Sequence, residues 1–302
     1  MFDGVKASRR AALAAAALAA ALAACLPGGS DAVAATGPLE RSPDGKRLTL
    51  TFADEFDEFR PYRLGQGVWR TTLREGPVDP QDFNVRTLKS NKELQLYVDP
   101  DMHGRRRGRE DDDRPLGLNP FTARNGTLEI AARPVPRELA ERLDGYRYVS
   151  GMITSQPSFR QTYGYFEMRA KLPRGKGVWP AFWLLPADLS WPPEIDVMES
   201  VGDPSKVYVT LHSNHVKAEG TEVRVSPDDF HTFSVSWTHD EVIWFVDGRE
   251  VKRMATPADM HKPMYMLANI ALGGDWAGQP DATTPFPARM QIDYIRAYRF
   301  AP

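Results

Sequence analysis

Three carboxylates are crowded into the stretch PPEIDVMES, residues 192–200, and such a group can carry out acid–base and nucleophilic chemistry. Alternate residues of a β-strand face the same side, so Glu194 and Asp196 share a face. Glu199 follows five residues after Glu194, and a regular strand would turn it to the opposite, apolar face. Because an unpaired carboxylate among apolar side chains is costly, we expect this strand to be irregular.

A β-bulge would remove the conflict. One extra residue near Val197 and Met198 places two residues opposite one on the neighbouring strand and resets the alternation. Glu199 then joins Glu194 on one face, with their Cα atoms about 13 Å apart. Side chains that lean together bring the two carboxyl groups to about 5–5.5 Å, the separation found in retaining glycosidases.

This arrangement suits a two-step displacement at a sugar. One carboxylate attacks the anomeric carbon in its ionised form, and another donates a proton to the leaving oxygen. Crowding of like charges raises the pKa of one member, which supplies the acid at neutral pH. Asp196, between the two glutamates, can hold a hydrogen bond to the nucleophile and adjust the coupled titration. A solvated acidic strand is the alternative, and the apolar residues between the acids disfavour it.

The elements around the acidic segment are mostly short strands. Apolar and polar residues alternate in five stretches, residues 47–52, 163–172, 232–238, 242–251 and 290–298. In the first, Leu48, Leu50 and Phe52 are expected on one face. Asp247-Gly248 predicts a hairpin turn, and residues 136–143 are the one convincing helical stretch. Many short strands separated by turn residues favour an all-β sandwich or jelly roll.

The segment EIDVME resembles the Glu-x-Asp-x-x-Glu signature of glycoside hydrolase family 16 in its bulged form. Further segments resemble the family in the family's order, namely residues 52–57, 90–97, 163–186, 230–248 and 293–298. Within the family, the chain is most similar to laminarinases and bacterial exopolysaccharide endoglycanases. The resemblance implies a concanavalin A-like jelly roll with a concave substrate cleft. It also implies Glu194 as nucleophile, Asp196 as assisting carboxylate and Glu199 as general acid/base.

The function implied by the resemblance is a retaining endo-β-glycosidase that hydrolyses internal linkages of a polysaccharide. The substrate would be a β-1,3- or β-1,3-1,4-glucan or a succinoglycan-like bacterial exopolysaccharide, and galactan hydrolases share the bulge. Two alternatives remain at this point. A non-catalytic, lectin-like carbohydrate-binding module would use the same sandwich, and a transglycosylase would use the same acids with an acceptor sugar in place of water.

Several side chains are candidates for sugar contacts. Trp179 and Trp183 are evenly spaced and share a face, which from spacing alone is as consistent with the core as with a cleft. The resemblance places both in the cleft and makes Asn91 a polar sugar contact. Trp276, in a glycine-rich loop, is a candidate for the cleft rim. His212 is either a structural strand residue or, as the resemblance implies, a supporting residue beside the acid/base.

No cofactor is expected to be required for catalysis. The sequence lacks a metal-ligand spacing for a catalytic ion, and it lacks a Gly-x-Ser-x-Gly elbow and a dinucleotide fingerprint. The resemblance implies a structural calcium on the convex side, with Glu55 and Asp293 at the side-chain positions. Asp111 to Asp113 are acidic enough to bind a cation, but a solvated loop is favoured there. A net charge of −2 without a basic stripe gives nucleic-acid binding little support.

The N-terminus predicts export. Basic residues precede the apolar run 11–24, which is too short to span a bilayer and is typical of a signal peptide. The run ends in LAAC, which resembles a bacterial lipobox with Cys25, the only cysteine, as the lipidated residue. The alternative is an ordinary secretory signal cut near Ala34 or Ala35.

Two regions follow from this interpretation. Residues 1–36 form the export signal and a tether rich in small residues, and residues 37–302 form the glycoside hydrolase catalytic domain. The protein is expected to be a monomer in the outer membrane or periplasm as a lipoprotein, or to be secreted. Its contact with a membrane would be through the lipid anchor alone, and its partner would be the polysaccharide substrate.

Overall fold

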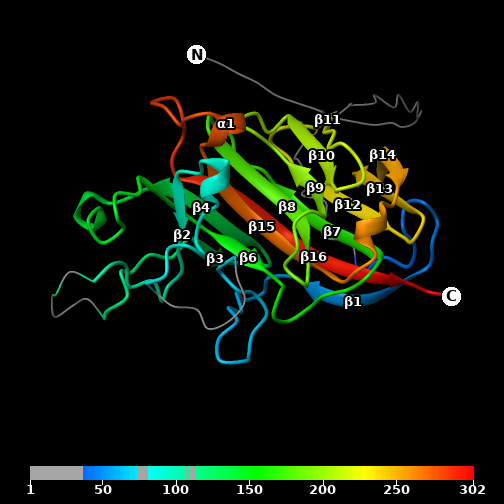
Figure 1. The fold of residues 1–302 in the computed structure, drawn as a ribbon, viewed down its shortest axis with the longest axis horizontal. Helices are drawn as coiled ribbons and strands as arrows, with labels where there is room; N and C mark the ends of the chain where they lie inside the picture. Colours follow the sequence, from blue (N-terminus) through cyan, green and yellow to red (C-terminus); the bar gives the residue numbers. More distant parts are fainter. Residues whose placement is uncertain (1–36, 74–80, 107, 109–112) are drawn as a thin grey trace, which may run out of the picture. The chain divides into compact units, whose positions relative to one another are not determined.

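The structure, a computed structural model, describes residues 37–73, 81–106, 108 and 113–302. The predicted signal and tether, with Cys25, lie outside the described residues, as do Asp111 and Asp112. The described residues form two β-sheets that pack face to face, and the fold is a jelly-roll β-sandwich as predicted (Figure 1). None of the helices in this part of the chain is long and apolar enough to cross a membrane.

The larger sheet has ten strands in the described part of the chain. Eight of them follow the order β14 (Arg249–Ala255), β13 (Glu241–Val246), β12 (His231–Trp237), β7 (Gly164–Lys171), β16 (Ala288–Phe300), β4 (Leu128–Pro134), β5 (Tyr148–Ser150) and β2 (Gln95–Tyr97). The other two are β1 (Leu48–Asp54), paired with β16, and β3 (Phe121–Ala123), paired with β4.

The smaller sheet carries the acidic segment on one of its central strands. Its order is β11 (Thr221–Arg224), β10 (Lys206–His212), β9 (Glu194–Glu199), β8 (Val178–Pro186), β15 (Met264–Leu272) and β6 (Met152–Thr154). Short helical turns lie in the loops, namely η1 (Lys89–Asn91), η2 (Arg137–Leu139), η3 (Ala258–Met260) and α1 (Gly274–Ala277). Of these, η1 and α1 flank the outer face of the smaller sheet (Figure 1).

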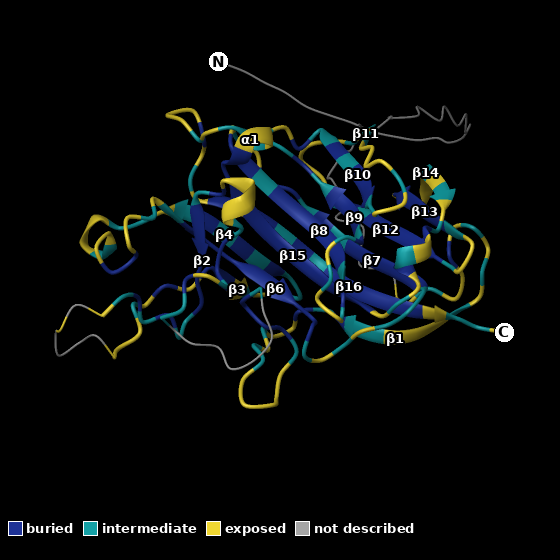
Figure 2. Cartoon of the chain, in the orientation of Figure 1, coloured by how far each residue is buried: buried dark blue, intermediate teal, exposed yellow. Residues whose placement is uncertain are grey.

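The core lies between the two sheets and follows the predicted alternation. On β7, Phe166, Met168 and Ala170 point into the central core, and on β12 the same holds for Phe233 and Val235. The strands that line this core are buried along most of their length (Figure 2). Burial of apolar area at about 25 cal/mol per Å² stabilises this packing. The polar residues that alternate with the core positions are therefore left for the outer faces of the sheets.

The predicted bulge in β9 is confirmed. On the β8 side, Met198 pairs with Phe182 and Asp196 with Trp183, which leaves Val197 without a partner. The pairing of β9 with β10 skips at the same place. The extra residue resets the alternation, so Ile195, Val197 and Met198 are all buried in the core while the three acids share the other face.

The predicted hairpin is also confirmed. Asp247 and Gly248 connect β13 to β14 and both have positive φ, 50° and 73°. A two-residue turn of this kind matches the right-handed twist of the flanking strands. The turn fixes the register next to it, in which Phe245 of β13 lies opposite Glu250 of β14, and an irregularity beyond this pair brings Trp244 opposite Lys252.

Two predictions about local structure were wrong. Strand β1 contains a bulge between Leu50 and Phe52, so its apolar residues do not share one face. Leu48 packs on an outer cluster, Leu50 is 39% exposed, and Phe52 packs on the central core. The stretch 136–143 forms only the 3₁₀ turn η2 and irregular turns. The backbone hydrogen bonds at its start span three residues, and the buried Arg142 donates to the carbonyls of His103 and Arg105, so tertiary contacts override the local helical pattern.

Deletion of Val197 tests the role of the bulge in the fold. Without Val197, the residues Glu194, Ile195, Asp196, Met198 and Glu199 alternate regularly, so the three acids keep one face and Ile195 and Met198 keep the other. The free energy of unfolding, measured by urea denaturation, is expected to fall only by the contribution of one buried valine side chain, about 1.5–3 kcal/mol. Met198→Leu keeps the residue count and the apolar volume, so its cost should stay below about 1.5 kcal/mol. A chain that no longer folds after deletion of Val197 would contradict this account, because the bulge that absorbs the extra residue, and not the residue itself, keeps Glu199 out of the core.

Candidate active site

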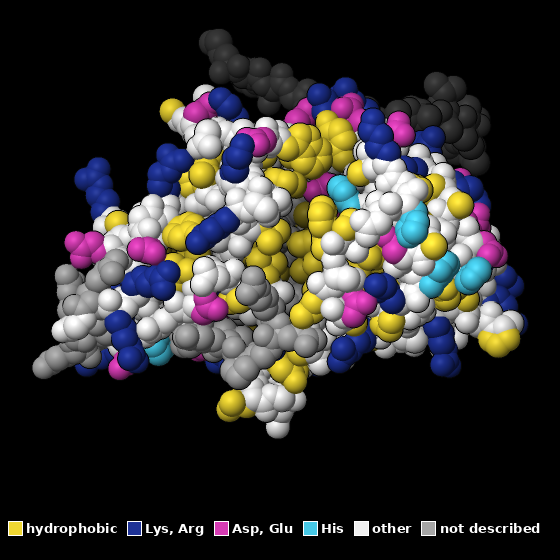
Figure 3. Space-filling model, in the orientation of Figure 1, with side chains coloured by type: hydrophobic (Ala, Val, Ile, Leu, Met, Phe, Trp, Pro, Cys, Tyr) yellow, Lys and Arg dark blue, Asp and Glu magenta, His cyan; other side chains and the backbone are white. Residues whose placement is uncertain are grey.

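A cleft of about 910 Å³ lies over the outer face of the smaller sheet. Its floor is made by the outward-facing residues of β8, β9, β10 and β15, and η1 and α1 contribute to its walls. Hydrophobic side chains flank the hollow on both sides, with acidic side chains in its depth (Figure 3). A concave, largely apolar site with a few polar groups is typical of ligand-binding sites.

The structure brings the three predicted acids together in this cleft. Glu194, Asp196 and Glu199 all line it, and Asp196 is the deepest, with 2% of its surface exposed. Glu194 lies opposite His212 in the pairing of β9 with β10. The His212 Nε2 atom is 3.1 Å from Asp196 Oδ2 and 3.9 Å from Glu194 Oε1. The spacing of this histidine and these two acids would also allow all three to contact one metal ion.

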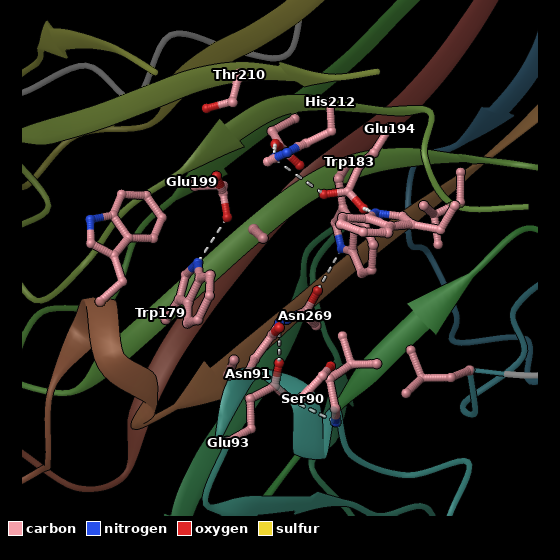
Figure 4. Close-up of a pocket in the computed structure, with 18 of the residues that line it drawn as sticks. Ser90, Asn91, Glu93, Trp179, Trp183, Glu194, Glu199, Thr210, His212 and Asn269 are labelled. Carbon is pink, nitrogen blue, oxygen red and sulfur yellow. Dashed lines mark hydrogen bonds and ion pairs between the residues drawn. The ribbon is translucent and has the colours of Figure 1, made fainter. Parts of the chain in front are cut away.

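An indole N–H holds each of the two glutamates. Trp179 Nε1 donates to Glu199 Oε1 at 3.0 Å (Figure 4). Trp191 Nε1 donates to Glu194 Oε2 at 2.9 Å. Trp191 was not among the predicted site residues, and it is 64% exposed at the edge of the cleft. The sequence did contain a signal, because Trp191 stands three residues before Glu194 on the short approach to β9.

Burial and mutual repulsion raise the pKa values of the acids. Burial, reinforced by the neighbouring carboxylates, raises the pKa of Glu194 and of Asp196 well above the usual range. Burial also raises the pKa of Glu199 to about 7, against the opposing hydrogen bond from Trp179, and the charge of Glu194 adds to the increase. The site can therefore hold a proton on Glu199 at neutral pH while another member of the trio is ionised.

The aromatic side chains form the floor and one rim of the cleft. Trp183 is 9% exposed and donates its indole N–H to Asn269 Oδ1 at 2.7 Å, so it is fixed as part of the floor. Trp179 stands edge-on to Trp276, with ring centroids 5.3 Å apart. Trp276 is 45% exposed and also contacts Tyr208. The structure thus places all three predicted tryptophans on the cleft face, where their rings can stack on sugars.

Asn91 also lines the cleft, and it leads to a polar network that was not predicted. Its side-chain amide donates to Glu93 at 3.3 Å, and Glu93 contacts the hydroxyl of Tyr97. Asn269 Nδ2 donates to the same hydroxyl at 3.0 Å, which extends the network to Trp183. Burial raises the pKa of Glu93. Asn269 and Tyr97 are 172 positions apart in the sequence and meet only in the folded chain, so strand periodicity could not reveal this network.

The side chains of the expected calcium site each pair with an arginine. Glu55 accepts two hydrogen bonds of 2.8 Å from the Arg296 guanidinium, and Asp293 accepts one of 2.6 Å from Arg169. A guanidinium is a permanent cation, and a calcium ion held by the same carboxylates would be repelled by it. The two side chains therefore do not fit a calcium site as they are arranged, and calcium remains a prediction with no part in the chemistry.

The fold and the site define a class of protein, the β-sandwich glycoside hydrolases. Comparison with known proteins gives the same class. The family model described as glycosyl hydrolases family 16 matches residues 118–296, and the chain belongs to this family. Two endo-1,3-1,4-beta-glycanases of Rhizobium meliloti (strain 1021) are similar in sequence. ExsH is 43% identical over 85% of this chain and 53% of its own length, and EglC is 41% identical over 84% and 52%. The chain therefore spans about half the length of these relatives.

The similarity extends to three dimensions. The catalytic domain of an endo-1,3-beta-glucanase (laminarinase) from Thermotoga petrophila RKU-1 aligns with a TM-score of 0.67 and 32% sequence identity. The alignment covers 85% of this chain and all of that domain. The match to a complete catalytic domain agrees with the family assignment and with the jelly-roll fold.

Replacement of Trp179 by Phe tests how the pKa of Glu199 is set. An N–H donor stabilises the ionised carboxylate and lowers its pKa, so loss of the indole should raise the pKa of Glu199 above about 7. ¹³C NMR titration of the glutamate carboxyl groups measures this directly. Trp276→Phe is the matched control, because its ring touches Trp179 on the side of the rim. An unchanged or lower pKa in Trp179→Phe would contradict the assignment.

Proposed function

We propose that this chain is a retaining endo-β-glycosidase that hydrolyses internal β-linkages of a β-1,3- or β-1,3-1,4-glucan. The observation that carries the proposal is the placement of Glu194 and Glu199 on one face of β9, each held by an indole N–H. The names of the similar proteins, endo-1,3-1,4-beta-glycanases and a laminarinase, support the substrate class. A lectin-like module would have no need for this arrangement of acids.

In the first step, a Glu194 carboxylate oxygen attacks the anomeric carbon. The Glu199 carboxyl donates its proton to the glycosidic oxygen, the carbon–oxygen bond breaks, and the sugar is left as an ester on Glu194. Glu194 must be ionised to react. Burial and the contact with Asp196 raise its pKa, and the nearby His212 and the hydrogen bond from Trp191 lower it and so favour the ionised form.

In the second step, water releases the sugar. The Glu199 carboxylate takes a proton from the water, whose oxygen attacks the anomeric carbon, and Glu194 leaves as a carboxylate. Because the pKa of Glu199 is about 7, this residue can give a proton in one step and accept one in the next at neutral pH. His212, within 3.1 Å of Asp196, acts as a positioning residue. Two inversions at one carbon give overall retention.

The cleft favours an uncharged stretch of glycan. Besides the three acids of β9, the buried carboxyl group of Glu93 lines it. A negatively charged sugar would be repelled by those of the four groups that are ionised, because the site has a low dielectric. If the natural substrate is a bacterial exopolysaccharide with acidic substituents, those substituents must point out of the cleft.

We also propose that the protein is exported and acts as a monomer. The apolar run before Cys25 supports a signal sequence, and LAAC supports lipid attachment at that cysteine. The tether up to residue 36 would then separate the catalytic domain from the membrane. Incorporation of labelled palmitate into the full chain, and its loss in Cys25→Ser, distinguishes a lipoprotein from a freely secreted enzyme.

The change Glu194→Gln tests the nucleophile. The amide cannot form the ester intermediate, so the release of reducing ends from laminarin and lichenan should fall by at least about a thousandfold. Binding of a β-glucan oligosaccharide, measured by calorimetry, should persist because the cleft keeps its shape. Glu129→Gln makes the same chemical change on the surface of β4 and should leave activity unchanged.

The stereochemistry of the reaction is read in the same experiment. ¹H NMR of the first product formed by the wild-type chain should show the β-anomer before mutarotation. Near wild-type turnover by Glu194→Gln would overturn the assignment of the nucleophile. Product of the α-configuration would overturn retention, and products longer than the substrate on addition of an acceptor sugar would show that transglycosylation competes with hydrolysis.

The charge preference of the cleft gives a further test. A β-glucan carrying carboxymethyl groups should show a KM several-fold higher than the parent polymer at low salt, because the ionised members of a group of four acids line the cleft. The difference should shrink at about 1 M salt, where the Debye length is about 3 Å. A hydroxyethyl derivative with equal substitution controls for the size of the substituent. Equal KM values for the carboxymethyl and hydroxyethyl polymers would contradict the preference.

A further inference from the structure

Two side chains of the larger sheet reach across the core to the bulge of β9. Trp244 of β13 is fully buried, and its indole Nε1 donates to the backbone carbonyl of Asp196 at 2.9 Å. Asp196 is the last regularly paired residue before the unpartnered Val197. The hydrogen bond thus fixes the backbone at the point where the alternation of β9 is reset.

Lys252 of β14 reaches the other side of the same irregularity. Its Nζ lies 3.4 Å from the carbonyl oxygen of Val209 and also donates to the carbonyl of Glu219. Val209 of β10 stands opposite both Val197 and Met198, where the bulge gives β9 one residue more than β10. Trp244 and Lys252, both from the larger sheet, therefore hold the neighbouring strands β9 and β10 at the position of the bulge.

The two side chains form one unit. Trp244 and Lys252 are cross-strand partners, and the Lys252 Nζ lies 5.3 Å from the centre of the Trp244 ring. The pairing of β13 with β14 skips between Trp244 and Phe245, so a second bulge sets the face on which Lys252 lies. A cation–aromatic contact of this kind orients both groups.

Electrostatics also couple Lys252 to the site. Burial and the charge of Glu199 raise the pKa of Asp196, and the hydrogen bond with Glu194 and the charge of Lys252 lower it. The other charged groups near Asp196 are Glu194 on its own strand and His212 on β10. Lys252 thus brings a positive charge to Asp196 from the larger sheet, whereas Glu194, Glu199 and His212 lie in the cleft.

We propose that Trp244 and Lys252 are positioning residues that hold the β9 bulge in the geometry required for hydrolysis. The proposal rests on the proposed function, because the bulge aligns Glu199 with Glu194. Neither residue lines the cleft, so they act through the backbone of β9 and β10 and not on the substrate. Misplacement of a reacting group by about 1 Å can cost on the order of a hundredfold in rate.

The variant Trp244→Phe removes the N–H donor and keeps an aromatic ring in the core. We expect kcat on lichenan to fall about tenfold or more with KM nearly unchanged, because the substrate contacts are left intact. Trp237→Phe is the matched control, since Trp237 is an equally buried tryptophan of the same sheet whose indole Nε1 has no hydrogen-bond partner. This control loses the same atoms and should keep its kcat.

Lys252→Met gives an independent test, because it keeps a long apolar side chain and removes the donor and the charge. We expect a similar fall in kcat, and recovery in Lys252→Arg, which can again donate to the two carbonyls. Equal kcat values in Trp244→Phe and Trp237→Phe would overturn the proposal for Trp244. Full activity in Lys252→Met, or no recovery in Lys252→Arg, would overturn it for Lys252.

Amide hydrogen exchange separates this proposal from the proposed function. Loss of the donor should speed the exchange of the β9 amides at Val197 and Met198 about tenfold in Trp244→Phe, relative to Trp237→Phe. This comparison needs no turnover. If the wild-type chain cleaved no β-glucan, the proposed function would fail while the exchange data would still decide whether Trp244 holds the bulge. Equal exchange in the two variants would overturn the proposal.

Discussion

The structure depends on the bulge around one residue that has no partner. Val197 is extra relative to both neighbouring strands, and the bulge that accommodates it keeps Ile195, Val197 and Met198 in the core. The same bulge allows Glu199 to share a face with Glu194. Fold and chemistry thus place the same demand on this strand, because a regular strand would give a charged core and a separated acid pair.

Close packing of acids in an apolar cleft is unfavourable, and indole groups offset part of the cost. Trp191 and Trp179 each donate to one of the two glutamates, and Trp244 donates to the backbone between them. An indole N–H can only donate, so it suits carboxylate and carbonyl oxygens, and it brings a large apolar surface with it. The tryptophans therefore contribute to the electrostatics of the site as well as to its shape.

Much of the fold and the placement of the acids could be predicted from periodicity. The β9 bulge was inferred from the spacing of Glu194, Asp196 and Glu199, because the cost of a buried charge leaves few other arrangements. The turn at Asp247-Gly248 was inferred from residues that tolerate positive φ. Both inferences use local chemistry that acts within a few residues along the chain. The same reasoning failed for β1, because nothing in an alternating apolar pattern marks a bulge between Leu50 and Phe52.

Contacts between distant segments could not be predicted in this way. The network of Glu93, Tyr97 and Asn269 and the reach of Trp244 to Asp196 join residues that are adjacent only after the sheets have packed.

The location of the acids has a consequence for how this kind of protein diversifies. They stand on β9, which is flanked by strands on both sides, whereas Asn91 and Trp276 come from the short turns η1 and α1 in the connecting loops. Insertions and exchanges are tolerated in loops far better than in central strands. Lineages can therefore acquire new glycan preferences by altering those loops while they inherit the reactive centre unchanged.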